Sequence, residues 1–188
     1  MELNFKDIAT VTMILFAVID IIGAIPAIIQ VRQQTGSIHP EKATFASLLI
    51  MLIFLFLGEN ILSFLGLDLS SFAIAGSFII FFLALEMILG IKLYKDEMPA
   101  TASIFPIAFP LIAGAGTMTT LLTLRAEYEI LTIIIGVALN LILVYLCLKN
   151  LRFLENMLGP VGISVVRKVF GFILLAIAVK LFRANVGV

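Results

Sequence analysis

The sequence has few of the residues on which soluble enzymes and nucleic-acid-binding proteins depend. Only 13% of its 188 residues are charged, and it contains one histidine, one cysteine and no tryptophan. Twelve basic residues balance twelve acidic ones, so there is no excess positive charge to favour nucleic acid as a partner. A single cysteine, Cys147, excludes a disulfide within the chain, and its apolar surroundings predict that it packs rather than reacts.

Motifs for catalysis, nucleotide binding and metal binding are also absent from the sequence. It contains no GxSxG, HExxH, CxxC or P-loop pattern. His39 and Cys147 are far apart in the chain and do not form a metal-binding set. We therefore expect no enzymatic activity, no cofactor and no metal site, although a membrane-embedded enzyme remains an alternative. Any active transport would draw on an ion gradient rather than on a nucleotide.

Apolar residues are abundant: 62% of the chain is hydrophobic and the mean hydropathy is +1.23. Soluble domains are closer to half apolar and a quarter charged, so this composition predicts an all-α, polytopic membrane protein. Crossing a bilayer takes about 20 apolar residues. Six segments satisfy this requirement: residues 5–30, 44–65, 71–91, 104–124, 130–148 and 165–184. We expect them to form one transmembrane domain over residues 1–188.

The distribution of lysine and arginine predicts the orientation of these spans. Eight of the twelve basic residues lie in or beside the links that follow spans one, three and five, and four lie on the opposite side. The positive-inside rule then places both termini outside, on the periplasmic side of an inner membrane. The eight are Arg32, Lys42, Lys92, Lys95, Lys149, Arg152, Arg167 and Lys168, and the four are Lys6, Arg125, Lys180 and Arg183.

The first span contains a carboxylate, Asp20, within the apolar run VIDIIGAIP at residues 18–26. An ionised aspartate at the bilayer centre costs about 2.5–3.5 kcal/mol on insertion scales, so it requires a compensating role. Gly23 and Pro26 both weaken helices and predict an interruption here. Asp20 is then a proton- or cation-coupling group, a partner for a substrate ammonium, or a cap for free N–H groups at the break.

The fourth span contains a second interruption, AGAGTMTT at residues 113–120. Gly114 and Gly116 permit close approach of the backbone. Three hydroxyl groups follow at Thr117, Thr119 and Thr120. One interpretation is a nest of backbone N–H groups that binds a carboxylate. The other is a set of small residues that packs helices together, with threonines bonded to their own backbone.

The two interruptions occupy matching places in the two halves of the chain. GAIPAII (23–29) aligns with GTMTTLL (116–122), which places Asp20 on Ala113. AGSFIIFFLAL (75–85) aligns with FGFILLAIAVK (170–180). Both alignments are offset by about half of the chain, which predicts a 3+3 inverted repeat with spans one and four interrupted. The expected repeats are residues 1–95 and 96–188.

Interrupted spans related in this way are typical of transporters. Free backbone groups are costly in lipid, so the breaks are expected to face each other across a central site. Half-helix N-termini there bind anionic groups, and half-helix C-termini and free carbonyls bind cations. This combination suits a zwitterion such as an amino acid, and it also suits a bare cation.

Three further polar side chains lie inside the predicted spans. Glu86 is either a coupling carboxylate or a partner for a basic residue at 167–168. Lys180 is expected to snorkel to the membrane interface or to pair with Glu59. Asn140 is expected to bridge two helices through hydrogen bonds.

At these residues the sequence resembles the MarC family of bacterial and archaeal inner-membrane proteins, within the LysE-type exporter superfamily. The resemblance covers essentially the whole chain. The family motif D-P-x-G-N-x-P corresponds to residues 20–26, and P-L-x-A-G-P-G-x-x-T-T corresponds to residues 110–120. Ile21 and Ala115 replace prolines of the motifs, and Ala24 replaces an asparagine that would add a polar group.

The resemblance implies six spans, no enzymatic activity, and transport of small neutral amino acids such as glycine and alanine, coupled to protons or sodium. An exporter of another small solute or a metal cation, a narrow channel and a non-transporting membrane subunit remain alternatives. Expected partners are the lipid bilayer, a small substrate and H⁺ or Na⁺, and a homo-oligomer is compatible with the sequence. The candidate substrate-binding residues are Asp20, Gly23, Ala24, Pro26, Gly114, Gly116, Thr117, Thr119 and Thr120, and the candidate coupling residues are Asp20 and Glu86.

Overall fold

The computed structural model describes residues 4–91 and 103–186, and within these ranges every regular element is a helix. Five helical spans are long and apolar enough to cross a membrane, and a bent pair of helices supplies a sixth. The predicted all-α membrane fold is therefore confirmed. The predicted loop after span three contains Lys92 and Lys95, and residues 92–102 lie outside the described part of the chain.

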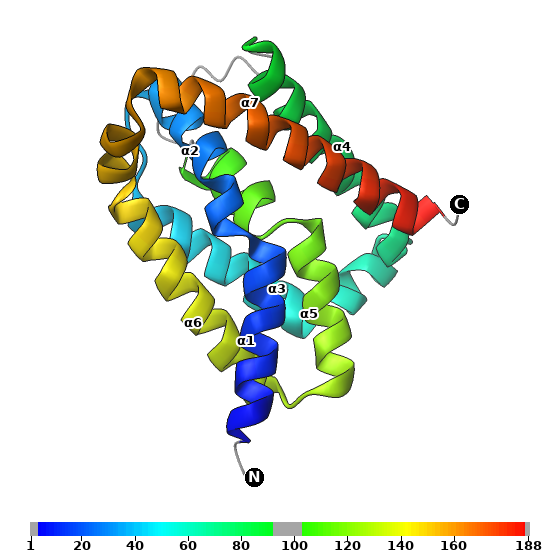
Figure 1. Cartoon of the computed structure of the whole chain (residues 1–188). Coiled ribbons are helices and arrows are strands. Elements are labelled where there is room, and N and C mark those ends of the chain that lie inside the picture. The colour runs from blue at the N-terminus through cyan, green and yellow to red at the C-terminus, as the bar shows by residue number, and fades with distance from the viewer. Residues whose placement is uncertain (1–3, 92–102, 187–188) are drawn as a thin grey trace.

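The helices follow the predicted spans closely (Figure 1). The first half contains α1 (Phe5–Ile19), α2 (Ile21–Thr35), α3 (Pro40–Phe64) and α4 (Leu69–Leu89). The second half contains η2 (Ser103–Ile112), α5 (Ala115–Glu127), α6 (Ile130–Lys149) and α7 (Leu151–Val186). α7 begins at Leu151, well before the predicted start of the sixth span at residue 165. The chain is already helical before Gly159, and this glycine alone departs from helical geometry, at φ 64° and ψ 172°.

The interruption of the first span lies at Asp20, between α1 and α2. Asp20 adopts a left-handed conformation, with φ 43° and ψ 51°. Aspartate is one of the few residues besides glycine that enters this region readily. Its N–H donates to the Phe16 carbonyl at the end of α1, and its carbonyl accepts from Ala24 N–H at the start of α2. The break predicted from glycine and proline is present, but the proline does not make it, because Pro26 lies inside α2.

The second interruption separates η2 from α5, whose axes differ by 51°. η2 is irregular because Phe105 and Phe109 have extended backbones, as residues that precede a proline prefer. Gly114 forms the N-cap of α5. A Cβ atom at Gly114 would overlap the Pro110 carbonyl oxygen, so this close turn requires glycine.

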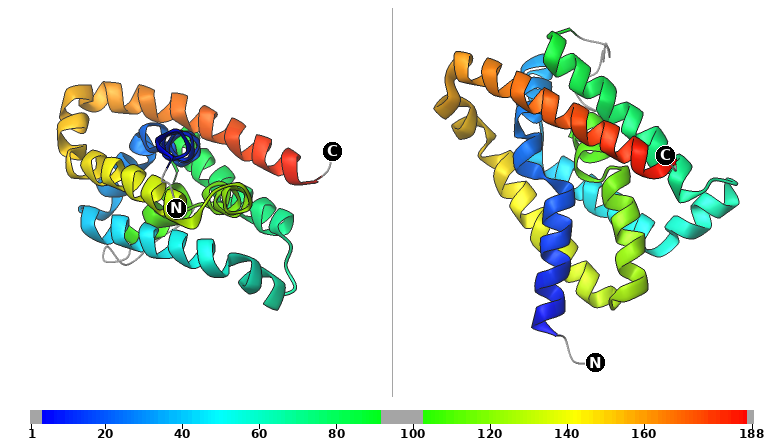
Figure 2. Two further views of the ribbon diagram at one scale, coloured as in Figure 1. Left: turned by 90° about the horizontal axis from the view of Figure 1, so that it is seen from below. Right: turned by 45° about the vertical axis from the view of Figure 1, so that its right-hand side comes forward.

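The helices pack in pairs that join the two halves of the chain. α1 contacts α6, η2 contacts α3, and α4 lies along α7 (Figures 1 and 2). At the α1–α6 contact, Asn140 Nδ2 donates to the Thr12 carbonyl at 3.0 Å, which confirms the predicted bridge. Gly136 permits the close approach there, since a Cβ atom would lie 2.8 Å from Val11 Cγ1.

The core lies between these pairs, and the outer faces are apolar. Leu15, Ile28 and Met51 are among the fully buried side chains of the core. Large apolar side chains such as Phe45 and Phe64 are more than half exposed. An apolar exterior over helices with internally bonded backbones is the arrangement that a bilayer requires.

Candidate functional site

Both interruptions line a single pocket of about 390 Å³. The ends of α1 and η2 and the start of α5 form part of its wall, and Ile80 of α4 and Ile177 of α7 contribute to the rest. Six of the nine candidate binding residues lie in this wall: Asp20, Gly114, Gly116, Thr117, Thr119 and Thr120. The sequence pattern thus predicted residues that the fold brings together from opposite halves of the chain.

The other candidate residues lie outside the pocket lining. Gly23, Ala24 and Pro26 are buried within α2, on the C-terminal side of the break. Glu86 is 6% exposed within α4 and is likewise not part of the lining. Their roles in binding or coupling remain predictions.

Asp20 caps the second half-helix of the first span. Its Oδ1 accepts a hydrogen bond from Gly23 N–H at 3.1 Å. Gly23 permits this geometry, because a Cβ atom there would lie 2.8 Å from Asp20 Cγ. An ionised carboxylate has about four lone-pair sites, so one capping bond leaves acceptor capacity. Since Asp20 also lines the pocket, capping and ligand binding are compatible.

The threonine hydroxyls of α5 donate to the backbone of their own segment. Thr117 Oγ1 donates to the Ile112 carbonyl at 2.9 Å, across the break. Thr119 and Thr120 both donate to the Gly116 carbonyl, at 2.9 and 2.8 Å. A hydroxyl has one proton, so in this conformation these groups present only lone pairs to a ligand. These contacts agree with the second interpretation of AGAGTMTT, in which the threonines bond to their own backbone. In this conformation the hydroxyls are suited to accept a hydrogen bond from an ammonium.

The start of α5 is the positive end of a half-helix in the pocket wall. Its N-cap, Gly114, has no side chain to bond the first N–H groups. The first N–H groups of a helix have no partner within the helix, and they carry partial positive charge. Because Gly114, Gly116 and Thr117 line the pocket, this end of α5 is available to an anionic group there.

Lys180 is a pocket residue that sequence reasoning did not assign to the site. It lines the same pocket as Asp20, and it forms no ion pair with a described residue. Glu59, its predicted partner, lines a separate depression beside Asp68, so that pairing is wrong. An apolar span such as α7 gives little indication of which face turns inward, and so the sequence carried no signal for this placement.

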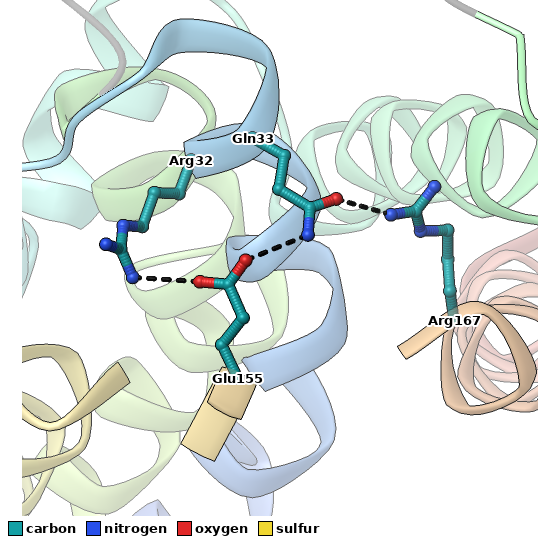
Figure 3. Close-up of polar contacts among 4 residues, drawn as sticks. All are labelled: Arg32, Gln33, Glu155 and Arg167. Atoms are coloured by element: carbon teal, nitrogen blue, oxygen red, sulfur yellow. Dashed lines mark hydrogen bonds and ion pairs between the residues drawn. The ribbon is translucent and has the colours of Figure 1, made fainter. Parts of the chain in front are cut away.

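A polar network joins α2 to α7 at a distance from the pocket (Figure 3). Arg32 NH1 contacts Glu155 Oε2 at 3.0 Å, and Gln33 Nε2 donates to Glu155 Oε1 at 2.9 Å. Arg167 NH2 donates to Gln33 Oε1 at 2.8 Å. Arg32 follows Asp20 by twelve residues, or about 18 Å along a helix. We call Arg32, Gln33, Glu155 and Arg167 the polar latch.

Comparison with known proteins identifies the family to which the chain belongs. Residues 5–186 match the model of the MarC family integral membrane proteins. The chain belongs to the MarC family. The match includes all eight helices of the described residues and both interruptions, so the predicted resemblance is confirmed over nearly the whole chain.

Several MarC relatives are about as long as this chain. A UPF0056 membrane protein of Methanocaldococcus jannaschii is 30% identical over 183 residues, which cover 89% of each chain. The UPF0056 membrane protein YhcE of Escherichia coli K12 is 30% identical over 183 residues, 88% of this chain and 85% of the relative. The UPF0056 inner membrane protein YhgN of the same strain is 28% identical over 186 residues, 94% of each chain. No solved structure matches the sequence.

Proposed function

We propose that the protein is a secondary active transporter of small zwitterionic amino acids, of the size of glycine, alanine or serine, driven by a proton or sodium gradient. One observation carries the proposal: the two interrupted spans line one pocket that contains Asp20 and the start of α5. Discontinuous helices that meet at a binding site are typical of secondary transporters. The proposal assigns the protein no enzymatic activity and no cofactor.

The pocket offers complementary partners for the two charges of an amino acid. The ammonium group would lie near Asp20, with hydroxyl lone pairs of α5 as further acceptors. The carboxylate would lie at the positive start of α5, beside Gly114. The remaining wall includes apolar side chains such as Ile80 and Ile177, which suits a small uncharged side chain. At about 390 Å³, the pocket is near the lower end of the range for small-molecule sites.

The pairing of helices supports the proposed inverted repeat. If α1 corresponds to η2 and α3 to α6, the contact of α1 with α6 has its counterpart in the contact of η2 with α3. α4 and α7 are the third spans of the two halves, so exchanging the halves leaves the contact between them unchanged. The second half-helix of each broken span also begins at a comparable position. Asp20 is the N-cap of α2 and Gly114 is the N-cap of α5, and Gly114 is one residue after Ala113, with which Asp20 aligns.

Alternating access would follow from movement of the two halves about this pocket. The pocket is at one end of the α2–α7 contact, and the polar latch is at the other. We propose that the latch holds α2 against α7 at the end of their contact away from the pocket, and that it releases when the pocket closes around substrate. Glu155→Gln should then speed glycine exchange across the membrane, and an unchanged rate would contradict this role.

The transport proposal is tested by reconstitution into liposomes. Wild-type protein should accumulate labelled glycine, alanine or serine under an imposed H⁺ or Na⁺ gradient, above protein-free liposomes. Asp20→Asn should abolish accumulation driven by the coupling gradient at an unchanged melting temperature. Asparagine is suitable because it tolerates the left-handed conformation and caps helices as well as aspartate does. If the Asn variant still concentrates substrate, Asp20 is structural.

The metal-cation alternative has less support. Within the described residues, no group of three His, Cys, Asp or Glu side chains could hold a metal ion. The name of the relative YhgN places that protein in an inner membrane, and we propose the same location here, with both termini on the periplasmic side.

A further inference from the structure

We propose that Lys180 binds the substrate carboxylate and thereby restricts the pocket to solutes that carry both an amine and a carboxylate. This inference rests on the transport function proposed above and specifies the substrate class of the same site. It depends on the placement of Lys180 in the pocket wall, which the sequence analysis did not anticipate.

One face of α7 contributes Lys180 to the pocket. Ile177 lies three residues before Lys180 and Ala184 lies four residues after it, and all three line the pocket. Residues at this spacing share one side of a helix. The wall that α7 provides is therefore a continuous stripe in which Lys180 carries the only charge.

The pocket thus contains charges of both signs on different elements. Asp20 lies at the junction of α1 and α2, and Lys180 lies on α7. The two side chains do not form an ion pair with each other, and Lys180 has no ion pair with any described residue. A zwitterion in the pocket can then direct its ammonium toward Asp20 and its carboxylate toward both Lys180 and the start of α5, which lines the same pocket.

The same pair of charges disfavours other solutes. A metal ion or a simple amine would meet Asp20 but would be repelled by Lys180. A simple carboxylic acid would meet Lys180 but would be repelled by Asp20. Discrimination by an unfavourable charge, as well as by a favourable one, is a general route to specificity.

Snorkelling is the competing role for Lys180. The residue also borders a groove on α7 that contains Arg183, and a lysine near the end of a span can direct its ammonium to the membrane interface. A snorkelling lysine would affect insertion and stability, but it would not distinguish glycine from an analogue without a carboxylate. The choice of analogue therefore separates the two roles.

The experiment is calorimetric titration of purified full-length protein with glycine and with glycinamide, in which an amide replaces the carboxylate. Wild type should bind glycine at least 10-fold more tightly than glycinamide. Lys180→Gln should weaken glycine binding about 10- to 100-fold, as expected for loss of a charge-assisted hydrogen bond, and should leave glycinamide binding no weaker. Lys180→Arg should retain part of the preference for glycine. Arg183→Gln is the matched control, because Arg183 does not line this pocket, and it should bind both solutes as wild type does.

The outcomes distinguish this inference from the transport proposal. If wild type binds glycine and Lys180→Gln binds it equally well, Lys180 is not a substrate-binding residue, and the transport proposal stands. If wild type binds none of glycine, alanine and serine, the transport proposal fails, and this inference fails with it. Should Lys180→Gln not fold, Lys180→Met retains the apolar stem without the charge, and the same loss of preference is expected.

Discussion

The two glycines at the second break, Gly114 and Gly116, should respond to alanine in opposite ways. A Cβ atom at Gly114 would overlap the Pro110 carbonyl oxygen, which is a backbone atom that cannot move without displacing η2. Overpacking of this kind costs about 1–3 kcal/mol. At Gly116 the nearest atom to an added Cβ would be Val18 Cγ1 at 3.6 Å, an ordinary van der Waals distance.

The magnitudes follow from these two environments. For a chain of this length each kcal/mol corresponds to roughly 2–4 °C in melting temperature, so Gly114→Ala should lower it by about 4–8 °C at a cost of about 2 kcal/mol. Gly116→Ala removes a flexible residue from a helix, which stabilises by up to about 0.5–1 kcal/mol, and its melting temperature should be unchanged or slightly higher. Because Gly116 lines the pocket, this stable variant should nevertheless bind glycine less well.

The assay is thermal unfolding of both variants in the same detergent, followed by glycine titration of Gly116→Ala. Each glycine serves as the control for the other, because they lie two residues apart in one break. A Gly114→Ala protein as stable as wild type, or a Gly116→Ala protein that melts well below it, would refute the described geometry of the break.

Three further substitutions test other parts of the structure. Gly23→Ala would displace the Asp20 carboxylate from its cap and should cost about 1 kcal/mol in thermal unfolding, the usual value of an N-cap, whereas unchanged stability would argue against the cap. Asn140→Ala removes the bond to the α1 carbonyl and should cost about 0.5–1.5 kcal/mol, and a neutral result would contradict the bridge. Asp68 is the N-cap of α4, and its side chain accepts a hydrogen bond from Ser71 N–H. Hydrogen bonding to Ser71 lowers the pKa of Asp68, so the stabilisation by this cap is present above the ordinary pKa of 3.8 and is lost as pH falls through the lowered folded-state value. Asp68→Asn should remove that acid dependence from unfolding curves.

The spans and their interruptions were predictable because they are encoded locally. Apolar runs of sufficient length predict spans, and Asp20 within such a run requires a partner wherever it lies. The position of the first break was less predictable, because Pro26 is accommodated inside α2 while Asp20 adopts the left-handed conformation. Asn140 was assigned correctly, since an amide in an apolar helix has to bond either its own helix or a neighbour.

The features that the sequence did not reveal depend on the rotation and packing of whole helices. Lys180 joins the pocket because α7 turns one particular face inward, and the run before it at residues 169–179 is apolar on every side, so its periodicity does not specify that face. The polar latch joins Arg32 to Glu155, two residues far apart in the chain that meet only when α2 packs against the start of α7. The bonds from the α5 hydroxyls to backbone carbonyls agree with one of the two interpretations of AGAGTMTT, but the bond from Thr117 across the break to Ile112 depends on the geometry of the turn.

The most direct test of the central claim is the accessibility of the second break to water and its protection by substrate. Gly116→Cys in a Cys147→Ala background places one thiol in the pocket wall, where the added Cβ has room. A membrane-impermeant thiol reagent should label this residue in proteoliposomes. Glycine should slow the labelling when it is supplied at a concentration that saturates this variant, which is expected to bind glycine more weakly than wild type does. A thiol that reacts from neither side of the membrane, or whose labelling no small amino acid slows, would contradict a substrate pocket between the two breaks.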